Sequence, residues 1–559
     1  MSIQATRRNF IRTFALSTAA VSLVACGGGS GENFSASFLH GVASGDPQAD
    51  GFIIWTRATP SEARSFMVFW EVASDAQFAQ IVKRGEFSTG PERDFTVKVD
   101  VTGLSANSAY FYRFNVGDVR SPTGRSKTLA SAKAEQVKLA VFTCSNYPAG
   151  YFNVYAEAAK LNDIDAAVHL GDYIYEYQRD GYASQDAAAL KREVDPKNEI
   201  ITLTDYRSRY AQYRTDADLQ ALHARLPFIA VWDDHEFAND TWNGGAENHD
   251  PATEGPFSAR RAAALQAYNE WMPIRLPDAS KPDRIYRSFD FGGLVALHML
   301  DTRLIGRDKQ LNYASYIGAG GAFDAAKFTS DMANPARQMM GAEQSAWLQG
   351  QLAASKATWQ ILGQQVLMAR MNIPAPLALQ QIGFGDYLAL AGKAQQAPAS
   401  LTPAEKAILA QPSVPYNLDA WDGYAVARET VLATAVALDK NLITLAGDTH
   451  NSWASDLADM KGKAAGVEFG VTSVTSPGFE EIFPKEDPLK VAAGLEQVIG
   501  PLVYAETGHR GFMIVTATAS QASAEWRYVS TVKSKTYTMV PGKTLRTLPG
   551  AANRKLLAV

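Results

Sequence analysis

Four apolar runs that each lead into a short polar motif constrain the fold of this chain more than any other feature. The runs are VKLAVF, DAAVHL, PFIAVW and NLITLA, and the motifs are FTCSNY, GDYIYEY, WDDHE and GDTHNSW. Apolar runs of this length indicate buried strands. Strands buried on both faces are typical of α/β proteins, which place ligands at the carboxyl ends of their strands. The pattern therefore predicts an α/β fold in which the four motifs meet at one rim of a sheet.

The motifs carry side chains of the kinds that bind metal ions. These are Cys144, Asp172, Tyr175, Asp234, Asp448 and His450. Thiolate, phenolate and carboxylate ligands together favour trivalent iron over zinc, with His450 completing the site of Cys144. Asp448 completes an oxygen-rich site with Asp172 and Asp234, which suits calcium, magnesium or manganese. Because the two oxygens of Asp172 can bridge two ions, the motifs predict a two-metal hydrolytic centre.

The spacing within two motifs suggests how the roles divide. Asp234 and His235 are adjacent, so in an extended backbone they point to opposite sides. Asp234 is then the better metal ligand, and His235 the better acid or stabiliser of the transition state. Asp448 and His450 are two residues apart and can face the same side, so one strand end can supply both ions.

Cys144 and Cys26 are the two cysteines of the chain. If Cys26 is removed or lipidated, Cys144 has no disulfide partner. Its position after a strand, beside Ser145 and Asn146, favours metal binding over inert burial. A catalytic thiol nucleophile is a third interpretation, which the metal-ligand character of the other motifs disfavours.

Two further residues are candidates for substrate contact. Arg303, in MLDTR, follows a strand run and either holds phosphate through its guanidinium or pairs with Asp301, and the pairing is favoured. His509, in ETGHRGF, precedes a late strand and is a candidate for the pocket.

The first 33 residues predict an export segment. Thr6-Arg7-Arg8-Asn9-Phe10 and the apolar stretch 14–25 have the pattern of a twin-arginine signal, and the stretch is too short to span a bilayer. The alternative is an amphipathic first helix, which the lack of acidic residues disfavours. Leu23-Val24-Ala25-Cys26 resembles a lipobox, which would make Cys26 a lipidated N-terminus with GGGSGEN as tether; ordinary cleavage nearby is the alternative. We expect an exported protein that engages the twin-arginine machinery and lies in the periplasm or is lipid-anchored to the outer membrane or cell surface.

The remaining chain divides into two expected domains. Residues 34–133 alternate in short β-like runs and predict an immunoglobulin- or fibronectin-like sandwich, with Tyr110 as a tyrosine-corner residue and Trp55 and Trp70 in its core. Residues 134–559 predict the α/β domain, with helices over 153–161, 204–225, 257–272, 342–355 and 425–439. The stretches 374–417 and 479–501 interrupt this pattern, and either shape substrate access or are structural insertions.

Several motifs together resemble one enzyme family. They are GVASGDP, CSNYPAGYF, HLGDYIYEY, WDDHEFAN, LDTR, DAWDGY, GDTHNSW and TSPG. The chain is similar over nearly its whole mature length to the alkaline phosphatase D family, within the calcineurin-like and purple-acid-phosphatase-like metallophosphoesterases. Compared with purple acid phosphatases it has Cys where they have Asp, and Asp where they have Asn and His.

The resemblance implies a fold, a metal centre and an activity. The fold is an immunoglobulin-like domain followed by a two-sheet metallophosphoesterase core. The implied Fe³⁺ ligands are Cys144, Asp172, Tyr175 and His450; the implied Ca²⁺ ligands are Asp172, Asp234 and Asp448. His235 takes a flanking catalytic role, and Asn239 is a weaker candidate on the phosphate side. The expected activity is hydrolysis of small phosphoesters by metal-bound hydroxide, with release of phosphate.

Alternatives to a phosphomonoesterase remain. One is a phosphodiesterase with phospholipase-D-like activity, for which the 374–417 stretch would shape a pocket for two ester substituents. Another, of a different class, is a non-catalytic exported binding protein with a vestigial metal site. The net charge of −5 argues against a nucleic-acid-binding protein.

Overall fold

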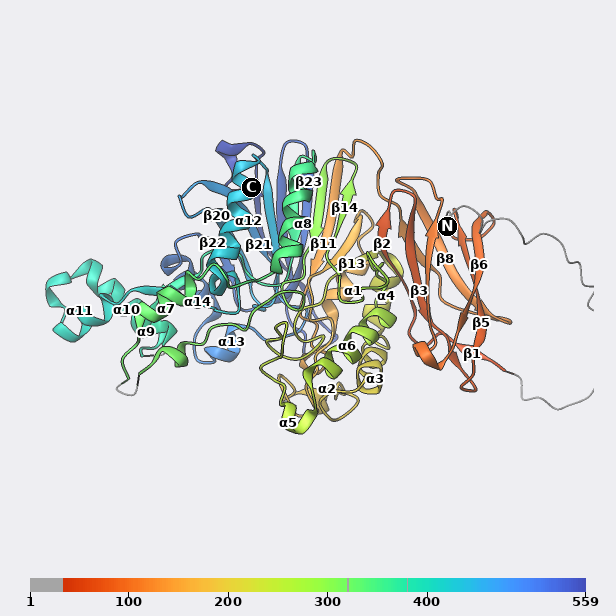
Figure 1. The fold of residues 1–559 in the computed structure, drawn as a ribbon, viewed down its shortest axis with the longest axis horizontal. Coiled ribbons are helices and arrows are strands. Elements are labelled where there is room, and N and C mark those ends of the chain that lie inside the picture. The colour runs from red at the N-terminus through yellow and green to blue at the C-terminus, as the bar shows by residue number, and fades with distance from the viewer. Residues whose placement is uncertain (1–33, 319–320, 380) are drawn as a thin grey trace, which may run out of the picture.

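The computed structural model describes residues 34–318, 321–379 and 381–559. Two large sheets pack face to face and share one extensive core, to which both contribute buried side chains such as Val141 and Ile443. Helices cover the outer faces (Figure 1). The predicted α/β fold is therefore confirmed, in the two-sheet form that the resemblance implied.

The first sheet has ten strands in the order β26-β25-β24-β23-β11-β12-β13-β2-β3-β7. Its four central strands β11, β12, β13 and β2 are mutually parallel, whereas the other neighbours are antiparallel. In chain order the strands are β2 (Val42–Gln48), β3 (Gly51–Arg57), β7 (Thr96–Thr102), β11 (Gln136–Phe142), β12 (Ala166–His169), β13 (Pro227–Ala230), β23 (Arg510–Thr518), β24 (Ala522–Val529), β25 (Met539–Thr547) and β26 (Leu557–Ala558).

The second sheet has seven strands in the order β14-β15-β16-β19-β21-β20-β22, of which β15, β16, β19 and β21 are parallel. The strands are β14 (Arg287–Phe291), β15 (Val295–Met299), β16 (Trp359–Gly363), β19 (Leu442–Ala446), β20 (Ser452–Ala458), β21 (Ala464–Gly470) and β22 (Leu502–Glu506). A second apolar core lies between this sheet and helices that include α8 and α12.

The helices confirm most of the expected positions. They are α1 (Asn153–Ala159), α2 (Ala187–Leu190), α3 (Leu203–Tyr213), α4 (Ala217–Arg225), α5 (Pro251–Glu254), α6 (Phe257–Trp271), α7 (Ala325–Met332), α8 (Gly341–Ala354) and α12 (Ala425–Ala437). The single helix expected over 204–225 is wrong. The chain breaks because the side chain of Asp216 accepts hydrogen bonds from the backbone N–H groups of Asp218 and Leu219 and so starts a second helix.

The two interrupting stretches fold into small elements beside the second sheet (Figure 1). The first contains β17 (Asn372–Pro374), α9 (Ala375–Ala378), α10 (Phe384–Gln396), α11 (Pro403–Leu409) and β18 (Ser413–Pro415). The second contains α13 (Phe479–Ile482) and α14 (Pro488–Val498).

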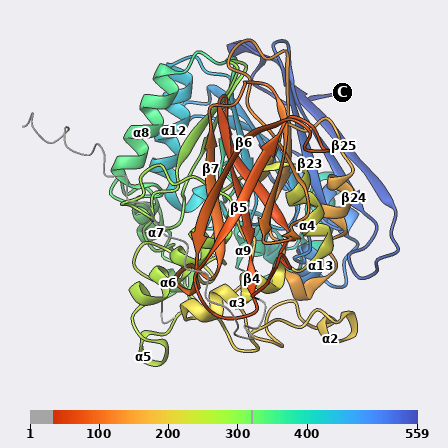
Figure 2. The ribbon, with the colours of Figure 1, turned by 90° about the vertical axis from the view of Figure 1, so that its right-hand side faces the viewer.

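The N-terminal segment is a β-sandwich, as predicted. Its outer sheet has the order β10-β8-β5-β6, with β9 paired to β8, and Figure 2 shows β5 and β6 toward the viewer. The strands of the outer sheet are β5 (Phe66–Ala73), β6 (Ile81–Thr89), β8 (Ala109–Val116), β9 (Val119–Arg120) and β10 (Gly124–Lys127). Two short strands, β1 (Ala36–Ser37) and β4 (Thr59–Pro60), form a separate pair. Its inner sheet is β2-β3-β7, and because β2 pairs with β13, the sandwich continues the ten-stranded sheet. The sequence did not predict this continuity.

Two aromatic predictions in the sandwich have different outcomes. The Tyr110 hydroxyl accepts a hydrogen bond of 2.9 Å from the backbone N–H of Ser105, so the tyrosine corner is confirmed. Trp70 is half-buried against the sandwich core. Trp55 is not a sandwich core residue, because it points away from the outer sheet, packs 5.6 Å from the ring of Trp271 and donates its indole N–H to the carbonyl of Glu270. It joins the sandwich to α6.

Candidate metal centre

The four motifs meet at a rim that the two sheets share. Cys144, Asp172 and Asp234 follow β11, β12 and β13, which are neighbours in the ten-stranded sheet. Asp448 and His450 follow β19, which lies in the seven-stranded sheet. The expectation that one sheet would supply all four motifs is therefore wrong, because face-to-face packing brings the ends of two sheets together.

The backbone at this rim is not extended. Cys144, Asp172, Asp448 and His450 all have positive φ angles, of 57°, 55°, 65° and 61°. This conformation is uncommon for residues other than glycine, and it occurs where surrounding structure enforces it, often at functional sites. Asp448 and His450 nevertheless contribute to different groups of ligand atoms, as expected for a strand end that serves two sites. Asp234 and His235, expected on opposite sides, both offer a ligand atom to one group with Asp172, within 4.8 Å of one another.

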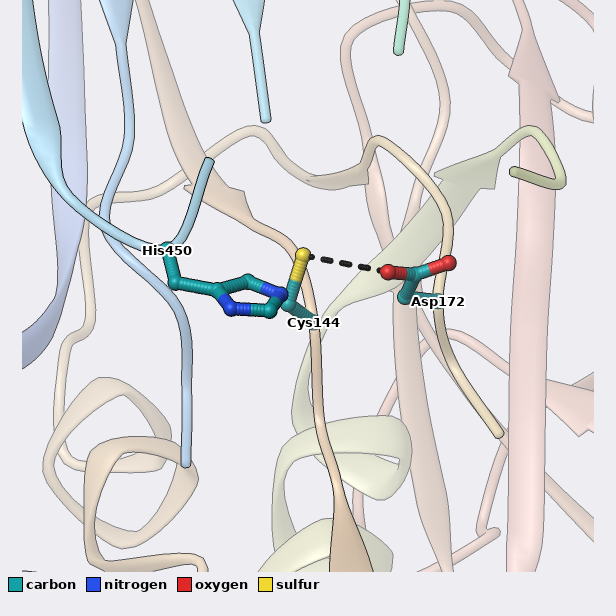
Figure 3. Close-up of side chains that lie close together, drawn as sticks. All are labelled: Cys144, Asp172 and His450. Atoms are coloured by element: carbon teal, nitrogen blue, oxygen red, sulfur yellow. Dashed lines mark hydrogen bonds between the residues drawn. The ribbon is translucent and has the colours of Figure 1, made fainter. Parts of the chain in front are cut away.

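Four side chains form what we call the thiolate cluster: Cys144, Asp172, Tyr175 and His450. Cys144 Sγ lies 3.4 Å from Asp172 Oδ2, and the Tyr175 hydroxyl lies 3.1 Å from the same oxygen and 3.3 Å from His450 Nε2. Figure 3 shows the thiol between the carboxylate and the imidazole. Cys144 is thus surrounded by ligand-type groups, an arrangement that favours metal binding over inert burial.

In the absence of a cation, the thiol, the phenol and the imidazole of this cluster are all neutral. Burial raises the pKa of the Cys144 thiol and of the Tyr175 hydroxyl, and the charge of Asp172 adds to both effects. Burial lowers the pKa of His450 to about 3, so its imidazole is neutral. A bound cation would offset the cost of ionising the thiol and the phenol, since metal ligands bind deprotonated.

Residues around the cluster orient its ligands. His450 Nδ1 donates a hydrogen bond of 2.7 Å to the carbonyl of Pro477, which directs the lone pair of Nε2 to the cluster. The Ser476 hydroxyl donates to the Tyr175 oxygen at 2.7 Å. Ser476 and Pro477 both belong to the TSPG motif, whose function was not predicted from the sequence.

A second group, the carboxylate cluster, consists of Asp233, Asp234 and Asp448, which offer oxygens within 4.8 Å of one another. Burial raises the pKa of Asp233 and of Asp448. Asp233 Oδ2 and Asp234 Oδ1 are buried and accept no hydrogen bond from any residue that the structure describes. Buried carboxylate oxygens without a hydrogen bond are costly, and a hard cation would satisfy them. Both clusters therefore fit metal ions.

Arg303 holds the carboxylate cluster together. Its fully buried guanidinium contacts Asp233, lies 2.8 Å from Asp419, 3.1 Å from Asp448 and 3.6 Å from Asp234. The favoured pairing with Asp301 is wrong: the carboxylate of Asp301 instead accepts hydrogen bonds from backbone N–H groups, including that of Arg303 itself. The N–H groups of the Arg303 guanidinium already face carboxylates, which argues against direct contact between Arg303 and the substrate.

His235 lies between the two clusters and is held by Glu176. Its Nδ1 is 2.7 Å from Glu176 Oε2, and its ring stacks on Tyr175 with centroids 4.2 Å apart. Burial alone would lower the pKa of His235, but Glu176, Asp172 and Asp234 outweigh burial and raise it well above the usual range. A protonated imidazole is a poor metal ligand but carries a proton that it can donate, which favours the acid role.

Comparison with known proteins identifies the family. The profile of the PhoD-like phosphatases matches residues 139–526, and that of their N-terminal domain matches residues 25–130. Alkaline phosphatase D of Bacillus subtilis (strain 168) is 36% identical over 515 residues, covering 89% of this chain and 78% of that protein. The chain belongs to the PhoD-like phosphatase family.

A solved structure of PhoD supports the same assignment. It superposes with a TM-score of 0.76 at 33% identity and covers 94% of this chain and 92% of that one. The family resemblance drawn from the sequence motifs is thus confirmed.

The weaker site predictions lie at the edge of this PhoD-like centre or outside it. Asn239 donates its backbone N–H to Glu176 at 2.7 Å and its side-chain amide to Glu247, so it contacts the carboxylate that holds His235. His509 is partly exposed and bonds to Glu506, and it belongs to neither cluster. Cys26 and the export segment lie outside the described residues. None of the helices in the described ranges is both long and apolar enough to cross a membrane.

Sequence reasoning missed Asp233, Glu176 and Asp419. Asp233 and Glu176 lie inside quoted motifs, WDDHE and GDYIYEY, and Asp419 begins DAWDGY. A search for every carboxylate in the motifs would have found all three.

Proposed function

We propose that this PhoD-like phosphatase is an exported phosphoester hydrolase that binds iron in the thiolate cluster and calcium in the carboxylate cluster. Family membership supports phosphoester hydrolysis, and the two chemically different clusters support two different ions. The observation that carries the metal proposal is the meeting of a thiol, a phenol, a carboxylate and a neutral imidazole around one point. Magnesium or manganese is the alternative for the second site.

When bound, the ions would lower the pKa of water and neutralise charge on the phosphoryl group. The chain's own residues then have distinct tasks. Asp172 belongs to the thiolate cluster and to the group with Asp234 and His235, so it couples the two sites. Glu176 keeps His235 protonated and oriented, and His235 donates its proton to the leaving oxygen.

Elemental analysis of the purified mature protein, with a visible spectrum, tests the metal proposal. We expect iron with calcium and a charge-transfer band from the thiolate and phenolate. Tyr175→Phe should shift or weaken that band. Zinc alone, or a spectrum indifferent to Tyr175→Phe, would contradict the assignment.

The name PhoD-like phosphatase does not distinguish the two activities. Parallel assays on a phosphomonoester and a phosphodiester would separate them. A metal-dependent rate with either ester would exclude the non-catalytic binding protein.

Export is supported by the arginine pair and the lipobox of the sequence. Changing Arg7 and Arg8 to Lys should retain the precursor in the cytoplasm, as cell fractionation would show. The intact mass of the mature protein would distinguish a lipidated Cys26 from ordinary cleavage. Normal export of the double variant would contradict the twin-arginine route.

A further inference from the structure

An apolar cavity of about 480 Å³ lies in the two stretches that interrupt the α/β pattern. Its walls come from α9, α10 and α13, and Figure 1 shows α9 and α10 beside α14. They include Leu377, Phe384, Phe479, Ile482 and Phe483. No charged side chain lines it within the described residues. Its volume lies in the range of small-molecule sites, and its lining suits an apolar group rather than a phosphate.

A short chain segment connects one wall of the cavity to the metal centre. The carbonyl of Pro477 accepts the hydrogen bond of His450, and two residues later Phe479 lines the cavity. The backbone N–H of Phe479 donates to the side chain of Asn451, the residue after His450, at 3.2 Å. The segment 477–479 thus links the thiolate cluster to the cavity.

Tyr416 forms a second link. Its ring lies 5.6 Å from that of Phe479 and lines the cavity. It also lines a polar cleft of about 580 Å³ whose lining includes Asp240 and Asp419, and Asp419 pairs with Arg303 of the carboxylate cluster. The apolar cavity therefore shares Tyr416 with a polar cleft whose Asp419 contacts Arg303 beside the carboxylate cluster.

We propose that this cavity receives the unbranched alkyl or acyl chain of a phosphoester substrate whose phosphoryl group lies at the metal centre. The inference rests on the proposed hydrolase function and adds to it the substrate class, namely phosphoesters of long-chain or acylated alcohols. It also gives a role to the 374–417 stretch, as a wall of the substrate site.

Binding of n-alkylphosphonates, which cannot be hydrolysed, tests the cavity without turnover. Calorimetry on the protein as purified should show affinity rising about threefold to fourfold per added methylene, so that octylphosphonate binds roughly 2,000-fold tighter than methylphosphonate or better. Hydrolysis of 4-nitrophenyl phosphate by the same sample tests the proposed function separately. Equal affinity for the two phosphonates, or no binding of either, would overturn the cavity proposal. An inactive sample that still prefers octylphosphonate would support the cavity and contradict the hydrolase.

Variants at the cavity sharpen the test. Ile482→Asp places a charge at the rim of the cavity, where Ile482 is 58% exposed, and Ala378→Phe fills part of the cavity. Each should reduce the preference for octylphosphonate about tenfold or more. Leu489→Asp is the matched control, because Leu489 is 67% exposed on α14 and does not line the cavity. It should keep the full preference. Loss of the preference in Leu489→Asp, or its survival in both cavity variants, would overturn the proposal.

Discussion

Asp172→Asn is expected to abolish both metal binding and phosphoester hydrolysis. One oxygen of Asp172 contacts Cys144 and Tyr175, and the carboxylate also belongs to the group with Asp234 and His235. The amide keeps the size of the side chain but removes a negative charge that belongs to the thiolate cluster and lies beside Asp234 of the carboxylate cluster. Turnover should fall by more than the roughly 10–100-fold caused by losing a residue behind a ligand. Elemental analysis and kcat on the same sample measure the two effects.

The backbone of this variant should be undisturbed. Asp172 has a φ of 55°, and asparagine tolerates that conformation at least as well as aspartate. Asp180→Asn is the matched control, because Asp180 has a φ of 65° and is exposed outside both clusters. It should retain metal and activity. A fully metallated, active Asp172→Asn protein would refute the bridging role.

Arg303→Met is expected to destabilise the metal-free protein by about 3–5 kcal/mol, because it leaves several buried carboxylates without their cation. Burial lowers the pKa of this guanidinium, but Asp233, Asp234 and Asp419 outweigh burial and raise the pKa well above its usual value. In the proposed site, calcium would supply positive charge to the same carboxylates. The loss in free energy of unfolding should therefore shrink when calcium is added, as denaturant titrations with calcium and with a chelator would show.

Arg428→Met controls for the removal of any buried arginine. Arg428 pairs with Asp422 and takes no part in the carboxylate cluster. Its replacement should be destabilising to the same extent with and without calcium. If the loss in Arg303→Met were equally indifferent to calcium, the arginine would be an ordinary core residue and not the organiser of a cation site.

Much of the fold and part of the site follow from local patterns. Each of the four apolar runs forms a strand, because length, apolarity and turn signals act over a few residues. The Tyr175 hydroxyl lies 3.1 Å from the Asp172 carboxylate, so two ligand-type residues of one motif meet at one site, as predicted. The prediction of one helix over 204–225 was wrong. The break comes from helix capping by Asp216, which is also a local signal. The predicted side-chain directions of Asp234 and His235 were wrong for a different reason: alternation holds within an extended strand, and both residues lie beyond the end of β13 at Ala230.

The sequence by itself determined which elements form and which ligand types the strand ends carry, since both depend on neighbouring residues. Only the tertiary structure decided how those ligands are shared between two clusters and what holds them. Arg303 meets Asp233 and Asp448 across 70 and 145 residues of chain, and Glu176 meets His235 across 59. The second sheet contributes His450 to a site whose other ligands follow strands of the first sheet. Such contacts arise when distant segments pack together, so no pattern along the chain encodes the partners.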